Sequence, residues 1–208
     1  MAFSLRDAKR SLTEQTIVEK ATGLFKERGF DQVSVRQIAK AAMVSEKTVF
    51  NYFPYKELMV VASAQPQMRG FMDDIQAKID AIAEPTEILR DFGQNLAELC
   101  VANPQAMTII VSELLTFDSG RLELVLRYIP DLYGPIRTVM TLARAQGKLR
   151  PEVNVELATD FFLSSVLNVI RTYFATGQVD RVRSMLNVSL EILLHGAFQH
   201  PPADAPHA

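Results

Sequence analysis

The chain has 208 residues, of which 48% are hydrophobic and 22% charged, and its formal net charge at pH 7 is −2. This composition predicts a globular protein of one or two domains with a substantial core. Cys100 is the only cysteine, which excludes an intrachain disulfide and a cysteine-based zinc site. The longest mostly apolar run, 161–170, is far shorter than the roughly 18 residues of a membrane-spanning helix.

Positive charge is concentrated near the N-terminus. Residues 1–60 contain ten Lys or Arg against seven Asp or Glu, whereas the remainder contains twelve against seventeen. A basic lobe on an acidic body suits a polyanionic partner at one end, although many ordinary protein surfaces are equally uneven. The first twelve residues lack the apolar core of a signal peptide, so we expect a cytoplasmic protein without a membrane partner.

Almost every segment has helical periodicity and none alternates convincingly as a strand does, so the predicted fold class is all-α. Residues 1–10 are expected to form a mobile basic arm. Gly29 is expected to end the first helix, and Pro66 and Pro104 suit the first turn of later ones. Residues 200–208 are predicted to be a disordered tail. The predicted helices are 12–28, 34–41, 45–52, 55–64, 66–83, 86–102, 104–117, 119–129, 131–147, 154–176 and 178–197.

Residues 33–53 contain two helix starts that are capped independently. Ser34 is a good N-cap and Gln37, three residues later, completes a capping box, while Ser45 caps a second short helix. Two short helices with about three residues of turn between them predict a helix-turn-helix. A plain helical hairpin within an α-helical core is the alternative. The second helix has a polar outer face, and a short polar helix on a compact base suits the major groove of DNA.

The stretch from about Ile17 to Leu58 resembles the TetR family of bacterial repressors in the segments ATGLFKERGF, SVRQIAKAAMVSEKTVFNYF and FPYKEL. The remaining helices match only in number, order and length. The resemblance implies a three-helix DNA-binding domain over 1–54 and a helical ligand-binding and dimerisation domain over 55–199. It further implies a homodimer that binds palindromic operator DNA and is released by a small, mostly apolar inducer. Neither a cofactor nor a metal is expected.

Matched residue by residue, the resemblance assigns DNA contacts to the second helix, to the recognition helix and to the start of the fourth. Lysines would neutralise phosphates, Arg36 has the fork geometry for guanine, and Asn51 could pair with adenine. Glu46 could accept from cytosine or simply help to cap its helix. The assigned residues are Ser34, Arg36, Ser45, Lys47, Thr48, Phe50, Asn51, Tyr52 and Lys56.

Two positions depart from the family pattern. Met43 stands where the family usually has glycine, at a turn position expected to adopt positive φ, which costs a bulky residue roughly 1–2 kcal/mol. Phe50 stands where tyrosine is common, so a phosphate contact through that hydroxyl is absent.

Residues 66–200 carry most of the aromatic residues and methionines. By default these form core, but as a set they resemble an apolar ligand pocket with a few polar anchors. The polar candidates could equally be interface or surface residues. The predicted ligand-binding residues are Phe92, Asn95, Met107, Phe117, Tyr133, Arg137, Phe161, Asn168 and Arg171.

The last two predicted helices, 154–176 and 178–197, are apolar on more than one side and must be covered from two directions. A four-helix bundle formed by two helices from each subunit is the favoured interpretation, and an internal core is the alternative. The predicted dimer-interface residues are Phe162, Val166, Leu186, Leu190, Leu193 and Leu194.

Enzyme function has little support in the sequence. No histidine precedes His195, so a serine or cysteine nucleophile has almost no general base, and the glycines are scattered singly rather than forming a phosphate-binding loop. A ligand-independent helix-turn-helix DNA-binding protein stays open as a second interpretation. The sequence therefore predicts a DNA-binding regulator without catalytic residues.

Overall fold

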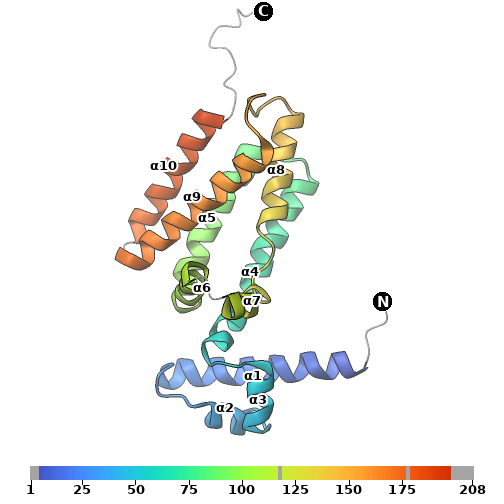
Figure 1. Cartoon of the computed structure of the whole chain (residues 1–208), viewed down its shortest axis with the longest axis vertical. Helices are drawn as coiled ribbons and strands as arrows, with labels where there is room; N and C mark the ends of the chain where they lie inside the picture. The colour runs from blue at the N-terminus through green and yellow to red at the C-terminus, as the bar shows by residue number, and fades with distance from the viewer. Residues whose placement is uncertain (1–4, 117–118, 177–178, 198–208) are drawn as a thin grey trace, which may run out of the picture. The chain divides into compact units, whose positions relative to one another are not determined.

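The computed structural model describes residues 5–116, 119–176 and 179–197, and every secondary-structure element within these ranges is a helix (Figure 1). This confirms the predicted all-α fold class. The chain divides into two compact units. Unit 1 comprises residues up to Pro66 together with Gln105–Ile129, and unit 2 comprises Gln67–Pro104 together with the chain from Pro130 onward.

Unit 1 is built on a long first helix that packs against two short ones. Ile17 and Ala21 are fully buried on one side of this helix, and Gly29 ends it at φ +83 by donating its N–H to the Phe25 carbonyl at 2.9 Å. The helices of unit 1 are α1 (Leu5–Arg28), α2 (Val35–Ala41), α3 (Glu46–Tyr52), the first part of α4 (Glu57–Asp80), α6 (Pro104–Thr116) and α7 (Ser119–Leu126).

The N-terminal end of α1 differs from the expected mobile arm. Residues 5–10 continue the helix instead, and residues 1–4 lie outside the described part of the chain. All residues from Leu5 to Leu12 are exposed. The Thr13 and Thr16 hydroxyls donate to the carbonyls of Lys9 and Leu12 at 2.9 and 2.8 Å, which adds side-chain bonds across the helical turns there. The first helix is therefore about two turns longer than its apolar pattern predicts.

Helices α6 and α7 belong to unit 1 because side chains far apart in sequence meet there. The Tyr55 hydroxyl donates to the Arg121 carbonyl at 3.2 Å, and the Phe53 and Tyr128 rings stack with centroids 6.1 Å apart. Arg121 also pairs with the buried carboxylate of Glu113 at 2.7 Å. The predicted boundary after residue 54 therefore differs from the structural division, which assigns 105–129 to the N-terminal unit.

Pro66 lies inside α4 rather than at the start of a new helix, so the predicted break between 64 and 66 is wrong. Proline lacks an N–H and so removes one backbone hydrogen bond from the helix. Buried apolar residues on both sides of it, among them Met59, Val61, Met68 and Ile75, continue the helical pattern of burial across the proline. Burial along the whole length of α4 outweighs the local preference of proline for a first turn.

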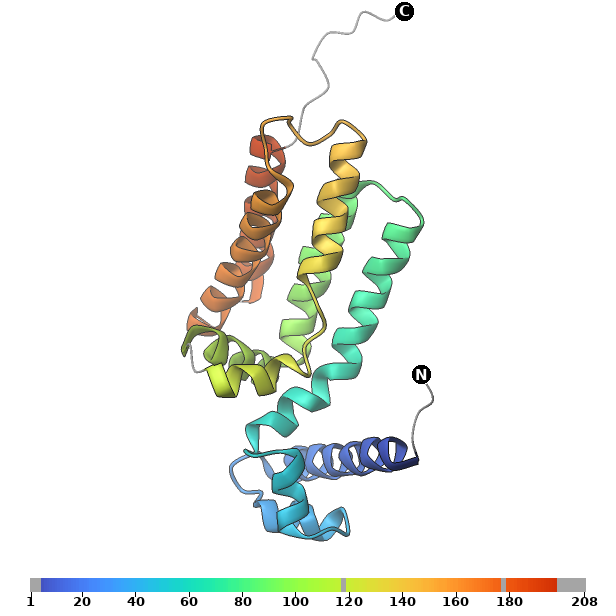
Figure 2. The ribbon, with the colours of Figure 1, turned by 45° about the vertical axis from the view of Figure 1, so that its right-hand side comes forward.

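Unit 2 is a helical bundle whose centre is a chain of aromatic rings. Phe92 of α5 lies with its centroid 5.1 Å from Phe71 of α4 and 5.5 Å from Phe162 of α9. Helix α9 contacts α5, α8 and α10, and Figure 2 shows α9 beside α10. The helices added here are α5 (Pro85–Ala102), α8 (Tyr133–Ala145), α9 (Val155–Thr176) and α10 (Val179–Ala197).

The predicted disordered tail, residues 200–208, lies outside the described residues. Across the described ranges, none of the helices combines the length and the apolar character that a membrane crossing needs.

Candidate functional site

The polar face of α3 is the first candidate site. Ser45 caps the helix, with its Oγ accepting from the Thr48 N–H at 3.0 Å and lying 2.8 Å from the Thr48 hydroxyl. Val49 is fully buried beneath the helix. Lys47 and Asn51 are exposed on the other side. A two-turn helix is too short to be stable alone, so this packing is what holds the polar face in place.

Helix α2 begins with the predicted capping box. The Ser34 Oγ accepts from the Gln37 N–H at 3.3 Å, and the Gln37 side chain accepts from the Ser34 N–H at 2.7 Å. Val33 and Ile38, on either side of this cap, are buried. Arg36 is exposed in the first turn, so its guanidinium is accessible from solvent.

The turn between α2 and α3 has the predicted backbone geometry. Met43 adopts φ 55 and its side chain is 91% exposed. The prediction of positive φ at this position is confirmed. Phe50 is 47% exposed on the outer side of α3, where it presents an aromatic ring without a hydroxyl.

Lys56 differs from the other predicted DNA contacts because its ammonium already has protein partners. Its Nζ donates to the carbonyls of Phe30 at 2.7 Å and Val33 at 3.0 Å, and lies 4.0 Å from the centre of the Phe30 ring. Lys56 therefore ties the start of α4 to the loop between α1 and α2. A phosphate contact through its remaining N–H stays a prediction.

Tyr52 is half-buried in the last turn of α3, next to the first helix. The Arg10 guanidinium carbon lies 6.0 Å from the centre of the Tyr52 ring. This contact places the N-terminal part of α1 beside the end of α3, in a position that the motif alone did not indicate.

The residues predicted to bind a ligand are not brought together around one cavity. Phe92 is buried in the aromatic chain of unit 2, Asn95 is half-buried, and Met107 is buried in α6 of unit 1. Phe117 lies outside the described residues. The other five are exposed on helices of unit 2: Tyr133, Arg137, Phe161, Asn168 and Arg171.

Three of the four proposed polar anchors are engaged with neighbouring side chains. Arg137 pairs with Glu156 at 2.8 Å, and its hydrogen bond lowers the pKa of that carboxyl. Arg171 donates to the Asn168 carbonyl oxygen at 2.9 Å. Arg137 and Glu156 also line an open pocket beside α8 and the start of α9, and ligand contacts through these polar residues stay predictions.

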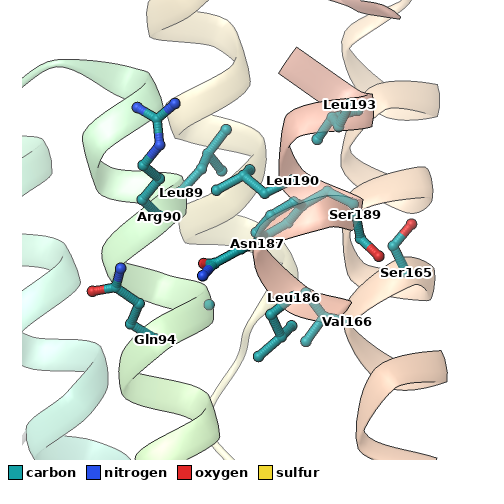
Figure 3. Close-up of a pocket in the computed structure, with 12 residues that line it drawn as sticks. Leu89, Arg90, Gln94, Ser165, Val166, Leu186, Asn187, Ser189, Leu190 and Leu193 are labelled. Atoms are coloured by element: carbon teal, nitrogen blue, oxygen red, sulfur yellow. The ribbon is translucent and has the colours of Figure 1, made fainter. Parts of the chain in front are cut away.

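A cavity in unit 2 lies between α5, α9 and α10 (Figure 3). Its volume is about 20 Å³, enough for a single water molecule. The Asn187 amide is directed from α10 toward α5 in Figure 3. Arg90, which lines the cavity, pairs with Glu191 of α10 at 2.8 Å, and this hydrogen bond lowers the pKa of the Glu191 carboxyl.

The residues predicted for a dimer interface pack inside the protomer. All six are only 3–7% exposed: Phe162, Val166, Leu186, Leu190, Leu193 and Leu194. All except Leu194 line the cavity between α5, α9 and α10. Among the residues of α9 and α10 whose burial is described, the large apolar side chains left exposed are instead Leu157, Phe161, Val188 and Ile192. Periodicity identified apolar helices correctly, but it did not tell which side the protomer covers with its own α5.

The described residues contain no cluster of three histidine, cysteine or acidic side chains that could hold a metal ion. Cys100 is buried, and desolvation raises the pKa of its thiol to about 12. This thiol therefore stays protonated at neutral pH and lacks the character of a nucleophile.

Comparison with known proteins places this geometry among transcriptional regulators. Residues 17–62 match the family described as bacterial regulatory proteins, tetR family. The HTH-type transcriptional repressor KstR2 of Rhodococcus jostii is 27% identical over 188 residues, covering 86% of this chain and 88% of that protein. The fatty acid metabolism regulator protein of Bacillus subtilis is 24% identical over 183 residues, covering 86% and 93%.

Among solved structures, the chain is similar to Thermus thermophilus FadR, a TetR-family transcriptional repressor crystallised with lauroyl-CoA. The TM-score is 0.76 at 28% identity, and the match covers 93% of this chain and 100% of that one. The similarity therefore extends well beyond the helix-turn-helix, through the helices that follow it.

Proposed function

Because this chain belongs to the TetR family of bacterial transcriptional regulators, we propose that it is a homodimeric repressor that binds a palindromic operator and is released by a small, mostly apolar ligand. The relatives named above are regulators rather than enzymes. We propose no catalytic activity for this chain, and we propose that it acts in the cytoplasm.

The capped, outward-facing α3 is the observation that carries DNA binding. Its buried Val49 and capping Ser45 fix the helix, while exposed Lys47 and Asn51 supply a phosphate partner and a base partner. Arg36 adds a forked donor at the start of α2.

The comparison with a solved structure favours a more specific ligand, a fatty-acyl thioester of coenzyme A, whose acyl chain is apolar but whose coenzyme A head is large and charged. Thermus thermophilus FadR, which is similar over nearly the whole chain, was crystallised with lauroyl-CoA. The aromatic chain of Phe71, Phe92 and Phe162 would give unit 2 an apolar environment for an acyl group. This likeness favours a ligand-responsive repressor over a ligand-independent DNA-binding protein.

Entry of a ligand between α5, α9 and α10 would require unit 2 to rearrange, and such a rearrangement would suit a switch. Pockets that bind small-molecule ligands occupy about 300–1,000 Å³. The cavity between α5, α9 and α10 has a volume of only about 20 Å³. An acyl chain would therefore bind a state with separated core side chains and shift the population toward it. A tenfold loss of operator affinity needs only about 1.4 kcal/mol of coupling between the two sites.

We propose that a second copy of the chain covers the exposed apolar residues of α9 and α10. Leu157 and Phe161 on α9 are 66% and 52% exposed, and Val188 and Ile192 on α10 are 55% and 61% exposed. Since α9 and α10 lie side by side (Figure 2), the four side chains would suit one two-fold, four-helix interface. Single exposed apolar side chains are common on protein surfaces, but four large ones on two neighbouring helices indicate an interaction site.

Selection of bound duplexes from random DNA, followed by competition with lauroyl-CoA, tests the proposal. We expect a recovered palindrome, binding that weakens steeply with salt, and release by lauroyl-CoA but not by free coenzyme A. A variant carrying Val188→Ser and Ile192→Ser should lose both the dimer and operator affinity. Failure to bind any duplex at low ionic strength would reject the repressor assignment. Tight binding of lauroyl-CoA without any change in DNA affinity would reject the switch alone.

A further inference from the structure

We propose that the N-terminal extension of α1, residues 5–12, is a second DNA-binding element that contacts the phosphate backbone beside α3. The proposal rests on the proposed function, because it concerns the same operator complex. It assigns to Arg6, Lys9 and Arg10 a role outside the helix-turn-helix motif. The expected partner is the sugar-phosphate strand that borders the major groove occupied by α3.

Helical geometry directs part of the extension toward the helix-turn-helix. Arg10 and Arg6 precede Ile17 by seven and eleven residues, which at about 100° per residue brings both within about 20° of Ile17 around the helix. Ile17 is fully buried on the side of α1 that faces the core of unit 1. Arg6 and Arg10 therefore continue this side of α1 beyond the point where packing ends.

The contact with Tyr52 fixes where this side of the extension lies. Arg10 approaches the ring of Tyr52, which belongs to the last turn of α3, to 6.0 Å. In Figures 1 and 2 the N-terminal end of α1 runs on past α3. A recognition helix enters the groove with its N-terminal end foremost, so the half-buried Tyr52 at its C-terminal end lies toward the edge of the groove. Cations next to that end are therefore close to the bordering phosphates.

The extension would add cations to those that the motif supplies, which are Arg36, Lys40 and Lys47. In α3 the positive charge of Lys47 is offset by Glu46, and the Lys56 ammonium is engaged by two backbone carbonyls. The extension adds Arg6, Lys9 and Arg10 against the single acid Asp7. Affinity for DNA depends strongly on the number of phosphates neutralised, so these three of the ten Lys and Arg residues within 1–60 would strengthen binding if they reached phosphates.

The extension is exposed to solvent, so its side chains are accessible to a separate partner such as DNA. Each residue from 5 to 12 is exposed, and the helix continues through them without burying a side chain in its own unit. Leu5 and Leu12 are also exposed, at 92% and 65%. A protein partner that used these leucines would compete with the DNA assignment, and a leucine variant separates the two.

The test compares two charge-neutralising double variants by fluorescence anisotropy with a selected operator duplex over a series of salt concentrations. Arg6→Gln with Lys9→Gln removes two cations from the extension and leaves the Arg10–Tyr52 contact intact. Lys20→Gln with Lys26→Gln removes the same charge from the same helix, with Lys26 about 24 Å beyond Arg10 along α1. Circular dichroism and size-exclusion chromatography check that both variants keep the helicity and the oligomeric state of the wild type.

For the extension variant we expect the slope of log affinity against log salt to fall by about 0.9 for each phosphate that the protein no longer neutralises. The selected duplex and a scrambled duplex should weaken by the same factor, because phosphate contacts carry no sequence information. The control variant should keep the wild-type slope. If the wild type bound the duplex and all three proteins had the same salt slope, this inference would be overturned while the proposed function would stand. A changed oligomeric state in Leu5→Ser with Leu12→Ser, together with unchanged slopes, would assign the extension to protein contact and also overturn it. If the wild type bound no duplex, the proposed function would fall and this inference with it.

Discussion

The Tyr128 hydroxyl donates a hydrogen bond of 2.6 Å to the Glu14 carboxylate, across 114 residues of sequence. Glu14 lies in α1 and Tyr128 follows α7. The bond therefore joins the first helix of unit 1 to the later segment, Gln105–Ile129, that belongs to the same unit. Tyr128 is 9% exposed, and burial raises the pKa of its hydroxyl above the usual range. The phenol therefore stays protonated and keeps donating well above neutral pH.

Removal of this hydroxyl should weaken unit 1. We expect Tyr128→Phe to lower the free energy of unfolding by about 1–2 kcal/mol, because the half-buried Glu14 carboxylate loses a charge-assisted hydrogen bond. Urea denaturation measures the loss, and Tyr133→Phe, at an exposed tyrosine, serves as the control with a change of less than about 0.5 kcal/mol. In a double-mutant cycle with Glu14→Ala the two effects should be non-additive. Additive effects would contradict a direct contribution from the bond.

The turn at Met43 should become more stable with glycine. A side chain at φ 55 is strained by its Cβ, and glycine removes that strain at the cost of a more flexible unfolded chain. We expect Met43→Gly to raise the melting temperature, by a net gain of about 0.5–1 kcal/mol. Because the Met43 side chain is 91% exposed, its removal leaves the packing of the turn nearly unchanged. An unchanged or lower melting temperature would argue against this turn geometry.

Ile82 has the same backbone strain as Met43, and its branched Cβ makes that strain larger. It adopts φ 54 in the turn after α4 and is 67% exposed, and a β-branched residue is especially unfavourable there. We expect Ile82→Gly to raise the melting temperature at least as much as Met43→Gly. Ile82→Val keeps the branched Cβ and should leave the strain in place. Equal melting temperatures for the glycine and valine variants would show that backbone strain is not the cause.

Local signals in the sequence were sufficient for the helix-turn-helix. The Ser34 and Gln37 pair and the Ser45 cap act within three residues, so the sequence contains the whole interaction. The positive φ of Met43 was predictable for the same reason, from its place in the family motif. Ile82 gave no comparable signal, because no glycine pattern marks the turn after α4.

Features that depend on distant partners could not be predicted in the same way. No local pattern pairs Tyr128 with Glu14, so the grouping of α6 and α7 with the N-terminal unit was missed. Leu190 is apolar at helical spacing whether its neighbour is α5 of the same chain or a second subunit. The full length of α1 is not predicted because residues 5–12 have no buried side chains. Apolar periodicity detects a helix only where one of its sides is buried.

Base recognition and phosphate contact on α3 should separate by mutation. We expect Lys47→Ala to weaken binding to selected and scrambled duplexes alike, with a smaller salt slope. Asn51→Ala should instead cost about 1–3 kcal/mol on the selected duplex and relax preference at one base pair. Anisotropy titrations with single-base variants of the duplex measure both. Loss of preference in Lys47→Ala but not in Asn51→Ala would reverse the two roles.

The ion pair between Glu84 and Lys148 should make the stability of unit 2 depend on pH in acid. The hydrogen bond from Lys148 lowers the pKa of Glu84 from its ordinary value of 4.5, and this pair joins the start of α5 to the segment after α8. Because the folded pKa is the lower one, the stabilisation is fully present above pH 4.5 and is lost as pH falls below it, through the folded pKa. Both side chains are about one-third exposed, so we expect Glu84→Gln to cost only about 0.2–1 kcal/mol at neutral pH.

Urea denaturation at a series of pH values should show that the difference in unfolding free energy between Glu84→Gln and the wild type becomes smaller in acid. Glu87→Gln, at an exposed glutamate of the same helix, is the matched control. A difference that stays constant down to the lowest pH would mean that the substitution acts through packing or through the end of the helix rather than through the charge of Glu84.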